Sequence, residues 1–278
     1  MIQSPLRIGA LVSGGGTNLQ AVLDACADGR IPGRVVFVGS DNPAAFGLSR
    51  AEKSGIPTFV VDYADIRARM KAEASHHPPP PSAQSISSLA PSARGIYAAT
   101  APGAARIEKS AANPAARRSG SPSFSDRVRQ ACEAELFHTM AAYPFDLLIL
   151  AGFMRILSPW FIDRVNTDPL LPRIMNIHPA LLPAFPGTDG YGDTFCHGCK
   201  VGGCTVHFVD YGEDTGPIIG QRAFPIEPSD TLEAVKKKGL ALEWELYPEC
   251  INLFAQGRLR IATGEKGRKV VRILPEQA

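Results

Sequence analysis

The chain has 278 residues, of which 45% are hydrophobic, and its 29 Lys and Arg nearly balance its 27 Asp and Glu. This length is sufficient for one large domain with a full hydrophobic core. The formal charge of +2 excludes the strongly basic surface that nucleic-acid binding or electrostatic membrane anchoring requires. Small anionic substrates are compatible with it, because they need positive charge at one site only.

The N-terminal stretch indicates where the protein is expected to reside. One Arg precedes a short apolar run that ends in Ser13 and glycines, unlike a secretion signal with its cleavage site. No apolar run approaches the roughly 20 residues that span a bilayer. We therefore expect a cytoplasmic protein without membrane or nucleic-acid partners, present as a monomer or a homodimer.

The six cysteines are expected as free thiols, because disulfides are rare in proteins that lack a secretion signal. Cys196, His197, Cys199 and Cys204 lie close enough in the sequence to bind zinc. A structural zinc site normally has a second pair of ligands farther along the chain, and none is evident. We therefore predict a glycine-rich loop with reduced thiols and no metal.

Three strand-like runs alternate with helical patterns at the start of the chain. Short apolar runs occupy residues 7–13, 35–40 and 58–62, and apolar residues recur at helical spacing between them. A βαβαβ order of this kind produces a parallel sheet with right-handed crossovers. We predict the α/β class, with a doubly wound, mostly parallel sheet whose N-terminal half is Rossmann-like.

The composition then changes over a long segment. From about Lys71 to Ser123, Ala, Pro and Ser dominate, and the apolar residues are too scattered to form a buried face. Such a segment cannot offset its ordering entropy by burial. We predict a single domain over residues 1–278 that is interrupted at 71–123 by a disordered or loosely packed insertion.

Beyond the insertion the pattern of a folded domain returns. A helix begins near Ser125, its expected N-cap, and DLLILAGF is the uninterrupted apolar run of a central parallel strand. The strand that carries Asn176 and His178 precedes a glycine-rich loop and two runs, GCTVHFVD and PIIGQRAFPI, predicted to be antiparallel near the sheet edge. A last helix, capped by Ser229 or Asp230, precedes a charged tail that we expect to be solvated.

The stretch SGGGTN at residues 13–18 lies between a strand and a helix. Its backbone N–H groups and the helix dipole favour an anion, and the glycines allow a phosphate to approach closely. It is not a P-loop, and Leu19 stands where a dinucleotide fingerprint has its third glycine. Phosphate binding is predicted, with a purely structural turn as the alternative.

Asn176 and His178 lie on the same side of their strand, because side chains alternate along it. An amide and an imidazole directed at one point can stabilise an oxyanion, especially when a carboxylate keeps the imidazole protonated. Candidates for that carboxylate are Asp210, Glu213 and Asp214. A buried structural histidine is the alternative. No Ser or Cys has a nucleophile-elbow context, so direct attack by a substrate amine on an acyl group fits best.

Five stretches occur in one order: SGGGTNLQAVLDA, AGFMRIL, NIHPALLPAFPG, TVHFVD and EDTGPII. Together they resemble the phosphoribosylglycinamide formyltransferase family of purine biosynthesis, over nearly all of residues 7–260 outside the insertion. The resemblance implies an enzyme that transfers a formyl group from the cosubstrate 10-formyltetrahydrofolate to the amine of glycinamide ribonucleotide, without a metal.

The resemblance also implies a role for individual residues. Catalysis would fall to a histidine acting as the acid, an asparagine on the formyl oxygen and an aspartate that tunes the histidine: His178, Asn176 and Asp214. The ribonucleotide would contact Gly16, Thr17, Asn18 and Glu243. The folate would contact Arg129 (with Arg127 as the alternative), Met154, Arg155, Ile156, Leu157, Asn176, Asp210 and Asp214.

Two positions depart from the family's pattern. Asp189 stands where a histidine is frequent, and Leu240 where a polar phosphate-side residue is expected, with Lys236 to Lys238 just upstream as substitutes. Other formyl-folate enzymes share the same core, but methionyl-tRNA formyltransferases normally add a C-terminal domain and formyltetrahydrofolate hydrolases an N-terminal one. We expect neither domain here. A catalytically idle nucleotide-binding module is the rival from a different class.

Overall fold

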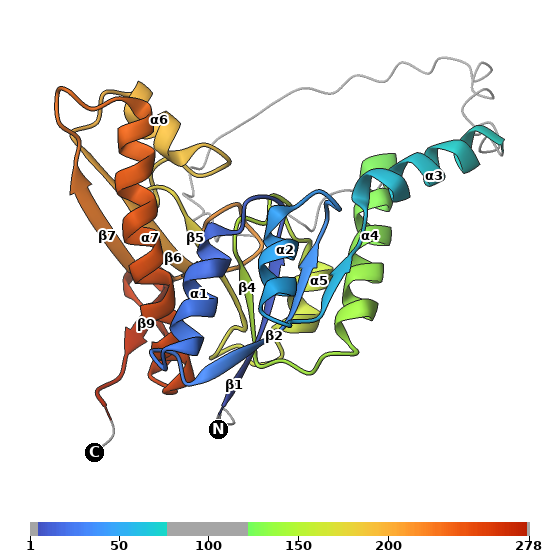
Figure 1. The fold of residues 1–278 in the computed structure, drawn as a ribbon, viewed down its shortest axis with the longest axis horizontal. Helices are drawn as coiled ribbons and strands as arrows, with labels where there is room; N and C mark the ends of the chain where they lie inside the picture. Colours follow the sequence, from blue (N-terminus) through green and yellow to red (C-terminus); the bar gives the residue numbers. More distant parts are fainter. Residues whose placement is uncertain (1–4, 77–121, 277–278) are drawn as a thin grey trace, which may run out of the picture.

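The structure is a computed structural model that describes residues 5–76 and 122–276. Within these residues the main sheet has seven strands in the order β3-β2-β1-β4-β5-β6-β7 (Figure 1). The strands are β1 (Leu6–Val12), β2 (Gly33–Ser40), β3 (Thr58–Val60), β4 (Leu147–Leu150), β5 (Ile174–His178), β6 (Val201–Phe208) and β7 (Ile218–Pro225). The helices are α1 (Thr17–Ala27), α2 (Phe46–Lys53), α3 (Tyr63–His76), α4 (Phe124–Met140), α5 (Pro159–Val165), α6 (Gly190–Cys196) and α7 (Leu232–Ala255).

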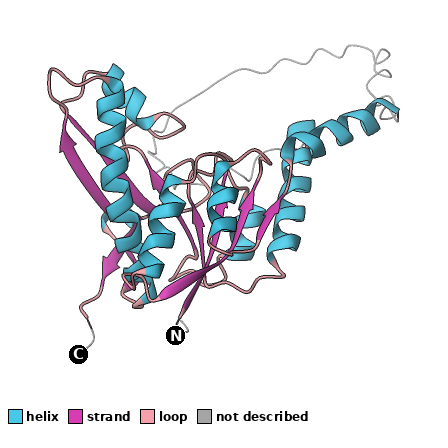
Figure 2. Cartoon of the chain, viewed as in Figure 1, coloured by secondary structure: helices cyan, strands magenta, loops and turns pink. Residues whose placement is uncertain are grey.

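The first five strands of the sheet, β3 to β5 in spatial order, are parallel. All four residues of β4 are buried, because helices cover both faces of the sheet (Figure 2). Helices α1 and α7 contribute Leu19 and Tyr247 to the core on one face. Helices α4 and α5 contribute Leu136 and Phe161 to the core on the other. The predicted doubly wound α/β fold is confirmed.

The last two strands of the sheet reverse direction. Strand β6 is antiparallel to β5, and β7 is antiparallel to β6, which confirms the predicted antiparallel edge. The register places His207 of β6 opposite Asn176 of β5, and Thr205 opposite His178. The polar residues near the carboxyl end of β5 therefore face a second strand that also carries polar side chains.

The boundaries of the predicted insertion differ from the structure at both sides. Helix α3 continues past Lys71 to His76, so the first residues of the predicted segment are helical. At the other side Ser123, and not Ser125, is the N-cap of α4. Its hydroxyl accepts from the Asp126 N–H while the Asp126 carboxylate accepts from the Ser123 N–H. Residues 77–121, and the order predicted for them, lie outside the described residues.

Two further predictions are corrected towards the C-terminus, and a third is extended. The stretch expected to be a glycine-rich loop contains helix α6. The N-cap of α7 is Thr231, whose hydroxyl accepts from a backbone N–H three residues on, and neither Ser229 nor Asp230. The tail is mostly exposed, as expected, but it also forms a strand that was not predicted: β9 (Lys269–Ile273) pairs antiparallel with β8 (Leu259–Thr263).

Helix α7, with 24 residues, binds the sheet through a buried tyrosine. The Tyr247 hydroxyl lies 3.0 Å from the Leu150 carbonyl oxygen of β4 and 2.9 Å from the Met175 carbonyl oxygen of β5. One hydroxyl therefore joins the helix to two neighbouring strands. Neither α7 nor any other helix in residues 5–76 and 122–276 is long and apolar enough to cross a membrane.

Removal of this hydroxyl should weaken the fold. We expect Tyr247→Phe to lower the free energy of unfolding by about 1–2 kcal/mol, because buried carbonyl oxygens lose their donor. Tyr143→Phe is the matched control, since its half-buried ring packs against Phe37 and Phe59 and should change stability by less than about 0.5 kcal/mol. Urea denaturation measures both, and equal stability of wild type and Tyr247→Phe would contradict the assignment.

Candidate active site

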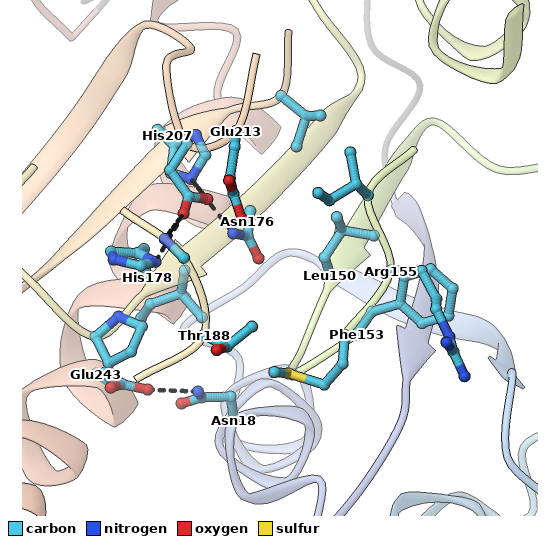
Figure 3. Close-up of a pocket in the computed structure, with 18 of the residues that line it drawn as sticks. Asn18, Leu150, Phe153, Arg155, Asn176, His178, Thr188, His207, Glu213 and Glu243 are labelled. Atoms are coloured by element: carbon cyan, nitrogen blue, oxygen red, sulfur yellow. Dashed lines mark hydrogen bonds and ion pairs between the residues drawn. The ribbon is translucent and has the colours of Figure 1, made fainter. Parts of the chain in front are cut away.

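A cavity of about 360 Å³ opens at the carboxyl ends of β4 and β5 (Figure 3). Its walls come from the loop at 152–157, the end of β5, the loop at 209–214 and one side of α7. In α/β sheets ligands bind at the carboxyl ends of the strands, because the loops and helix N-termini gather there. The cavity is therefore the place to look for the predicted site residues.

His178 is 2% exposed and lies between two oxygen atoms. Its Nδ1 is 3.2 Å from Asp214 Oδ2, and its Nε2 is 2.8 Å from the Phe185 carbonyl oxygen. A neutral imidazole can donate from one nitrogen only, whereas an imidazolium donates from both. Both ring nitrogens of His178 therefore face an oxygen acceptor at the cavity wall.

Asp214 has a backbone φ of 52°, in the left-handed region, which directs its carboxylate back towards β5. One oxygen accepts from the Gly187 N–H at 2.9 Å, and the other lies 3.6 Å from His207 Nε2. Burial by itself raises the pKa of Asp214, but hydrogen bonds from His207 and Gly187 and the nearby His178 outweigh it and lower the pKa. Asp214 is therefore a charged partner at one end of the cavity wall, in contact with two histidines.

His207, which was not predicted as a site residue, lies beside Asn176 and Asp214. Its Nε2 lies 3.3 Å from Asn176 Nδ2, and its Nδ1 lies 2.9 Å from the Phe208 carbonyl oxygen. Asn176 and His207 both line the cavity. The stretch TVHFVD carried the signal, since alternation places this histidine on one face of its strand. Its partner across the sheet depends on register, which the pattern alone does not reveal.

A second buried carboxyl group occupies another part of the wall. Glu243 accepts from Asn18 Nδ2 at 2.6 Å (Figure 3). It also accepts from the Tyr191 hydroxyl at 2.6 Å. Burial raises the pKa of Glu243, although both hydrogen bonds oppose it. Asn18 Oδ1 is buried and has no partner among the described residues, so it offers an unused acceptor. Tyr191 fits against α7 because a Cβ at Gly239 would lie 2.1 Å from its ring.

The glycine turn before α1 has the predicted strand-turn-helix placement. Gly16 is the N-cap with φ 67°, and a Cβ there would lie 2.6 Å from Gly47 Cα, so only glycine fits. Asn18 lines the cavity, but Gly16 and Thr17 are not part of its wall. The structure therefore brings one of the three predicted turn residues to Glu243 and leaves the other two beside the cavity.

The residues predicted to contact folate are only partly brought together. Met154–Leu157 line the cavity, as do Asp210 and Asp214. Arg129 is exposed on α4, pairs with a neighbouring aspartate at 3.0 Å and is absent from the wall, as is Arg127. The loop at 154–157 therefore forms a continuous wall with the loop at 209–214, without either arginine.

Of the two departures from the family pattern, Leu240 lines the cavity, whereas Asp189 is not part of its wall. Lys236, Leu240 and Glu243 follow one another at spacings of four and three residues, which is one face of α7. Lys236 Nζ lies 3.3 Å from Asp189 Oδ1, with both side chains largely exposed. Lys238 Nζ forms an ion pair with Asp230, which is not part of the wall. Of the three lysines named as substitutes, Lys236 alone belongs to the wall.

The cysteine-rich stretch does not assemble a ligand set. Cys204 is buried in β6, Cys199 is half-buried and Cys196 is exposed. In the part of the chain that the structure describes, no group of three or more His, Cys, Asp or Glu side chains could hold a metal ion. The thiols are free, as their sequence context predicts.

The model of the formyl transferase family matches residues 6–251. The chain belongs to this family. Two phosphoribosylglycinamide formyltransferases are among its relatives, from Escherichia coli strain K12 at 31% identity and from Mycobacterium tuberculosis strain H37Rv at 32%. The matches cover 92% and 96% of this chain and 90% and 94% of theirs. The resemblance seen in the five sequence stretches is confirmed.

Solved structures agree with this family membership. Glycinamide ribonucleotide transformylase 1 from Symbiobacterium toebii is 38% identical, with a TM-score of 0.66 over 97% of this chain and 94% of that one. Phosphoribosylglycinamide formyltransferase from Coxiella burnetii is 28% identical, with a TM-score of 0.65 over 97% and 93%. The chain spans 19% of the trifunctional purine biosynthetic protein adenosine-3 of Bos taurus, at 29% identity.

The raised pKa of Glu243 makes stability depend on pH in a definite direction. The folded protein holds this proton more firmly than the unfolded chain does. The resulting stabilisation is complete below the unfolded pKa, about 4.3, and is lost as the pH rises through the raised value.

We expect the unfolding free energy of wild type to fall relative to that of Glu243→Gln as the pH rises from about 4 to about 8. Chemical denaturation at a series of pH values measures the difference. Glu245→Gln, at an exposed site on the same helix, is the control and should show the wild-type trend. Parallel curves for wild type and Glu243→Gln would refute this account of the buried carboxyl.

Proposed function

We propose that the chain transfers a formyl group from 10-formyltetrahydrofolate to the amine of glycinamide ribonucleotide. The observation that carries this proposal is the cluster of Asn176, His178 and Asp214 on one cavity wall, in a chain of the formyl transferase family. An amide N–H and an imidazolium N–H are suitable donors to an oxyanion at an acyl carbon. The names of the bacterial relatives support the choice of acceptor.

In the proposed reaction the amine nitrogen attacks the formyl carbon, and the carbonyl electron pair moves to oxygen. Asn176 and His178 donate hydrogen bonds to this oxyanion, for which the His178 Nε2–H turns from the Phe185 carbonyl to the substrate. The carbon–nitrogen bond to folate then breaks, and His178 protonates the leaving nitrogen. The amine gives its proton to Asp214, directly or through water, and from there His178 is reprotonated.

The two substrates are assigned to opposite parts of the cavity. Met154 and Ile156 are 56% and 57% exposed, and the apolar surface they offer with Leu157 suits a flat heteroaromatic ring. The linked polar side chains of Asn18 and Glu243, which line the other part of the cavity, suit the ribose hydroxyls of the ribonucleotide. We propose Asp210 and Arg129 as further folate contacts, and Gly16 and Thr17 at the start of α1 as phosphate contacts.

One assay tests the function and separates it from its rivals. Purified protein is mixed with 10-formyltetrahydrofolate, and release of tetrahydrofolate is followed with glycinamide ribonucleotide, with methionyl-tRNA or with neither. We expect release that requires glycinamide ribonucleotide and yields its formylated product. Release without any acceptor indicates a hydrolase, release only with methionyl-tRNA indicates the second rival, and no release in any mixture indicates an idle module.

His178→Ala should remove most turnover, because His178 is assigned to charge that develops in the transition state. We expect kcat to fall by about 10²–10⁴-fold with little change in the melting temperature. His138→Ala is the control, since that histidine is exposed on α4 and lies outside the cavity wall. A folded His178→Ala protein with nearly wild-type turnover would falsify the assignment.

Lys236 is expected to contribute to binding of the phosphorylated substrate. The cations of the wall are Arg155, which is bound to the buried Asp41, and Lys236, whose partner Asp189 is exposed. We expect Lys236→Met to raise the KM for glycinamide ribonucleotide about tenfold, the value of one charged hydrogen bond. Steady-state kinetics should show no such change for Lys237→Met, the exposed neighbour outside the wall. Equal KM values in the two variants would exclude this role.

A further inference from the structure

The wall of the cavity opposite His178 is a loop at residues 153–158 that has no regular secondary structure (Figure 3). Phe153 and Leu157 are buried, whereas the side chains between them face the cavity or solvent. A loop of this kind has no helix or strand ladder to hold it. Besides the burial of Phe153 and Leu157, hydrogen bonds to the rest of the domain must therefore hold its shape.

One end of the loop is held by Asp41, a 4% exposed residue that directly follows β2. Its two carboxylate oxygens have different partners. The Arg155 Nε–H donates to Oδ2 at 2.5 Å, and the Ser13 hydroxyl donates to Oδ1 at 2.5 Å. The same hydroxyl accepts from the Met154 N–H at 2.9 Å. Asp41 thus holds two successive loop residues, one directly and one through Ser13.

The other end of the loop is held by Glu133, a 1% exposed residue in the middle of α4. The Ser158 N–H donates to Glu133 Oε1 at 2.7 Å, and the Ser158 hydroxyl donates to Oε2. Ser158 is also the N-cap of α5, so its position sets where that helix begins. Burial raises the pKa of Glu133, although the two bonds oppose it.

Neither carboxyl group belongs to the cavity wall. A buried carboxyl is unfavourable unless it is hydrogen-bonded, and core packing alone would be served better by apolar side chains. Both carboxyl groups accept hydrogen bonds from the same short loop, Asp41 from the end of β2 and Glu133 from α4. This shared target is what distinguishes them from an ordinary structural ion pair such as Arg7 with Asp146.

We propose that Asp41 and Glu133 are positioning residues that fix the two ends of the loop at 153–158 and thereby set the affinity of the cavity for the formyl donor. The inference rests on the proposed function, which assigns this wall to the folate. A loop that is fixed before binding spares the donor the entropic cost of ordering it. The ribonucleotide, assigned to Asn18 and Glu243, should not depend on either carboxyl group.

The test compares Asp41→Asn, Ser13→Ala and Glu133→Gln with wild type. We expect the KM for 10-formyltetrahydrofolate and the Kd for tetrahydrofolate to rise about tenfold, while the KM for glycinamide ribonucleotide changes less than about twofold. Ser13→Thr keeps a hydroxyl and should restore donor binding. Asp146→Asn is the control, since it breaks a comparable ion pair at the start of β4 and should lower stability without changing the KM for the donor.

The outcomes separate the inference from the proposed function. A wild-type protein without glycinamide-ribonucleotide-dependent transfer refutes the function, and the inference with it. An active wild type with unchanged donor KM in folded Asp41→Asn and Ser13→Ala overturns the inference alone. An equal rise in both KM values also overturns it, because that indicates general loosening. If Asp41→Asn does not fold, Ser13→Ala decides, since its half-buried side chain is the milder change.

Discussion

Strand β6 runs back along β5, and the register of this one antiparallel pair places His207 opposite Asn176. The loop that follows β6 returns at Asp214, whose left-handed backbone turns the carboxylate to face both His178 and His207. A slip of one residue would move every β6 side chain to the other face of the sheet. The polar cluster of the cavity therefore depends on a ladder of backbone hydrogen bonds, more than on any contact between its own side chains.

Carboxyl groups in different surroundings have pKa values displaced in opposite directions around this cavity. Hydrogen bonds and nearby histidines outweigh burial at Asp214 and lower its pKa. At Glu243 and Glu133 burial outweighs two hydrogen bonds, and the pKa is raised. The same functional group is thus a charged partner of two histidines at Asp214 and a weakly acidic hydrogen-bond acceptor at Glu243 and Glu133.

Apolar runs were sufficient to predict the sheet, and alternation along β5 was sufficient to predict that Asn176 and His178 lie together, as they do on the cavity wall. Local patterns failed where two residues compete for one role, as at the N-caps of α4 and α7, because adjacent Ser, Thr and Asp all satisfy the same preference. Helix α6 was missed because its glycines disfavour a helix. Tyr191 within it packs against Phe224 and Val235 from distant parts of the chain.

His207, Asp41 and Glu133 were missed for a different reason. Each owes its position to a residue far away in the sequence: Asn176 across a strand pair, Arg155 across the sheet, and Ser158 on another helix. A lone histidine or carboxylate carries no mark of such a partner before the chain is folded. Residues that act through tertiary contacts are therefore the ones that motif and period do not reveal.

Tyr191 fits closely against Gly239, 48 residues away, since a methyl group at 239 would overlap the phenol ring. The residue that one position tolerates therefore depends on the residue at the other. A related protein with tyrosine at the first position must have glycine at the second, and a bulkier residue at the second requires a smaller one at the first. The two sites should therefore change together among homologues. An exchange at one of them alone would disturb the hydrogen bond from Tyr191 to Glu243, and with it the part of the cavity wall that Glu243 forms with Asn18.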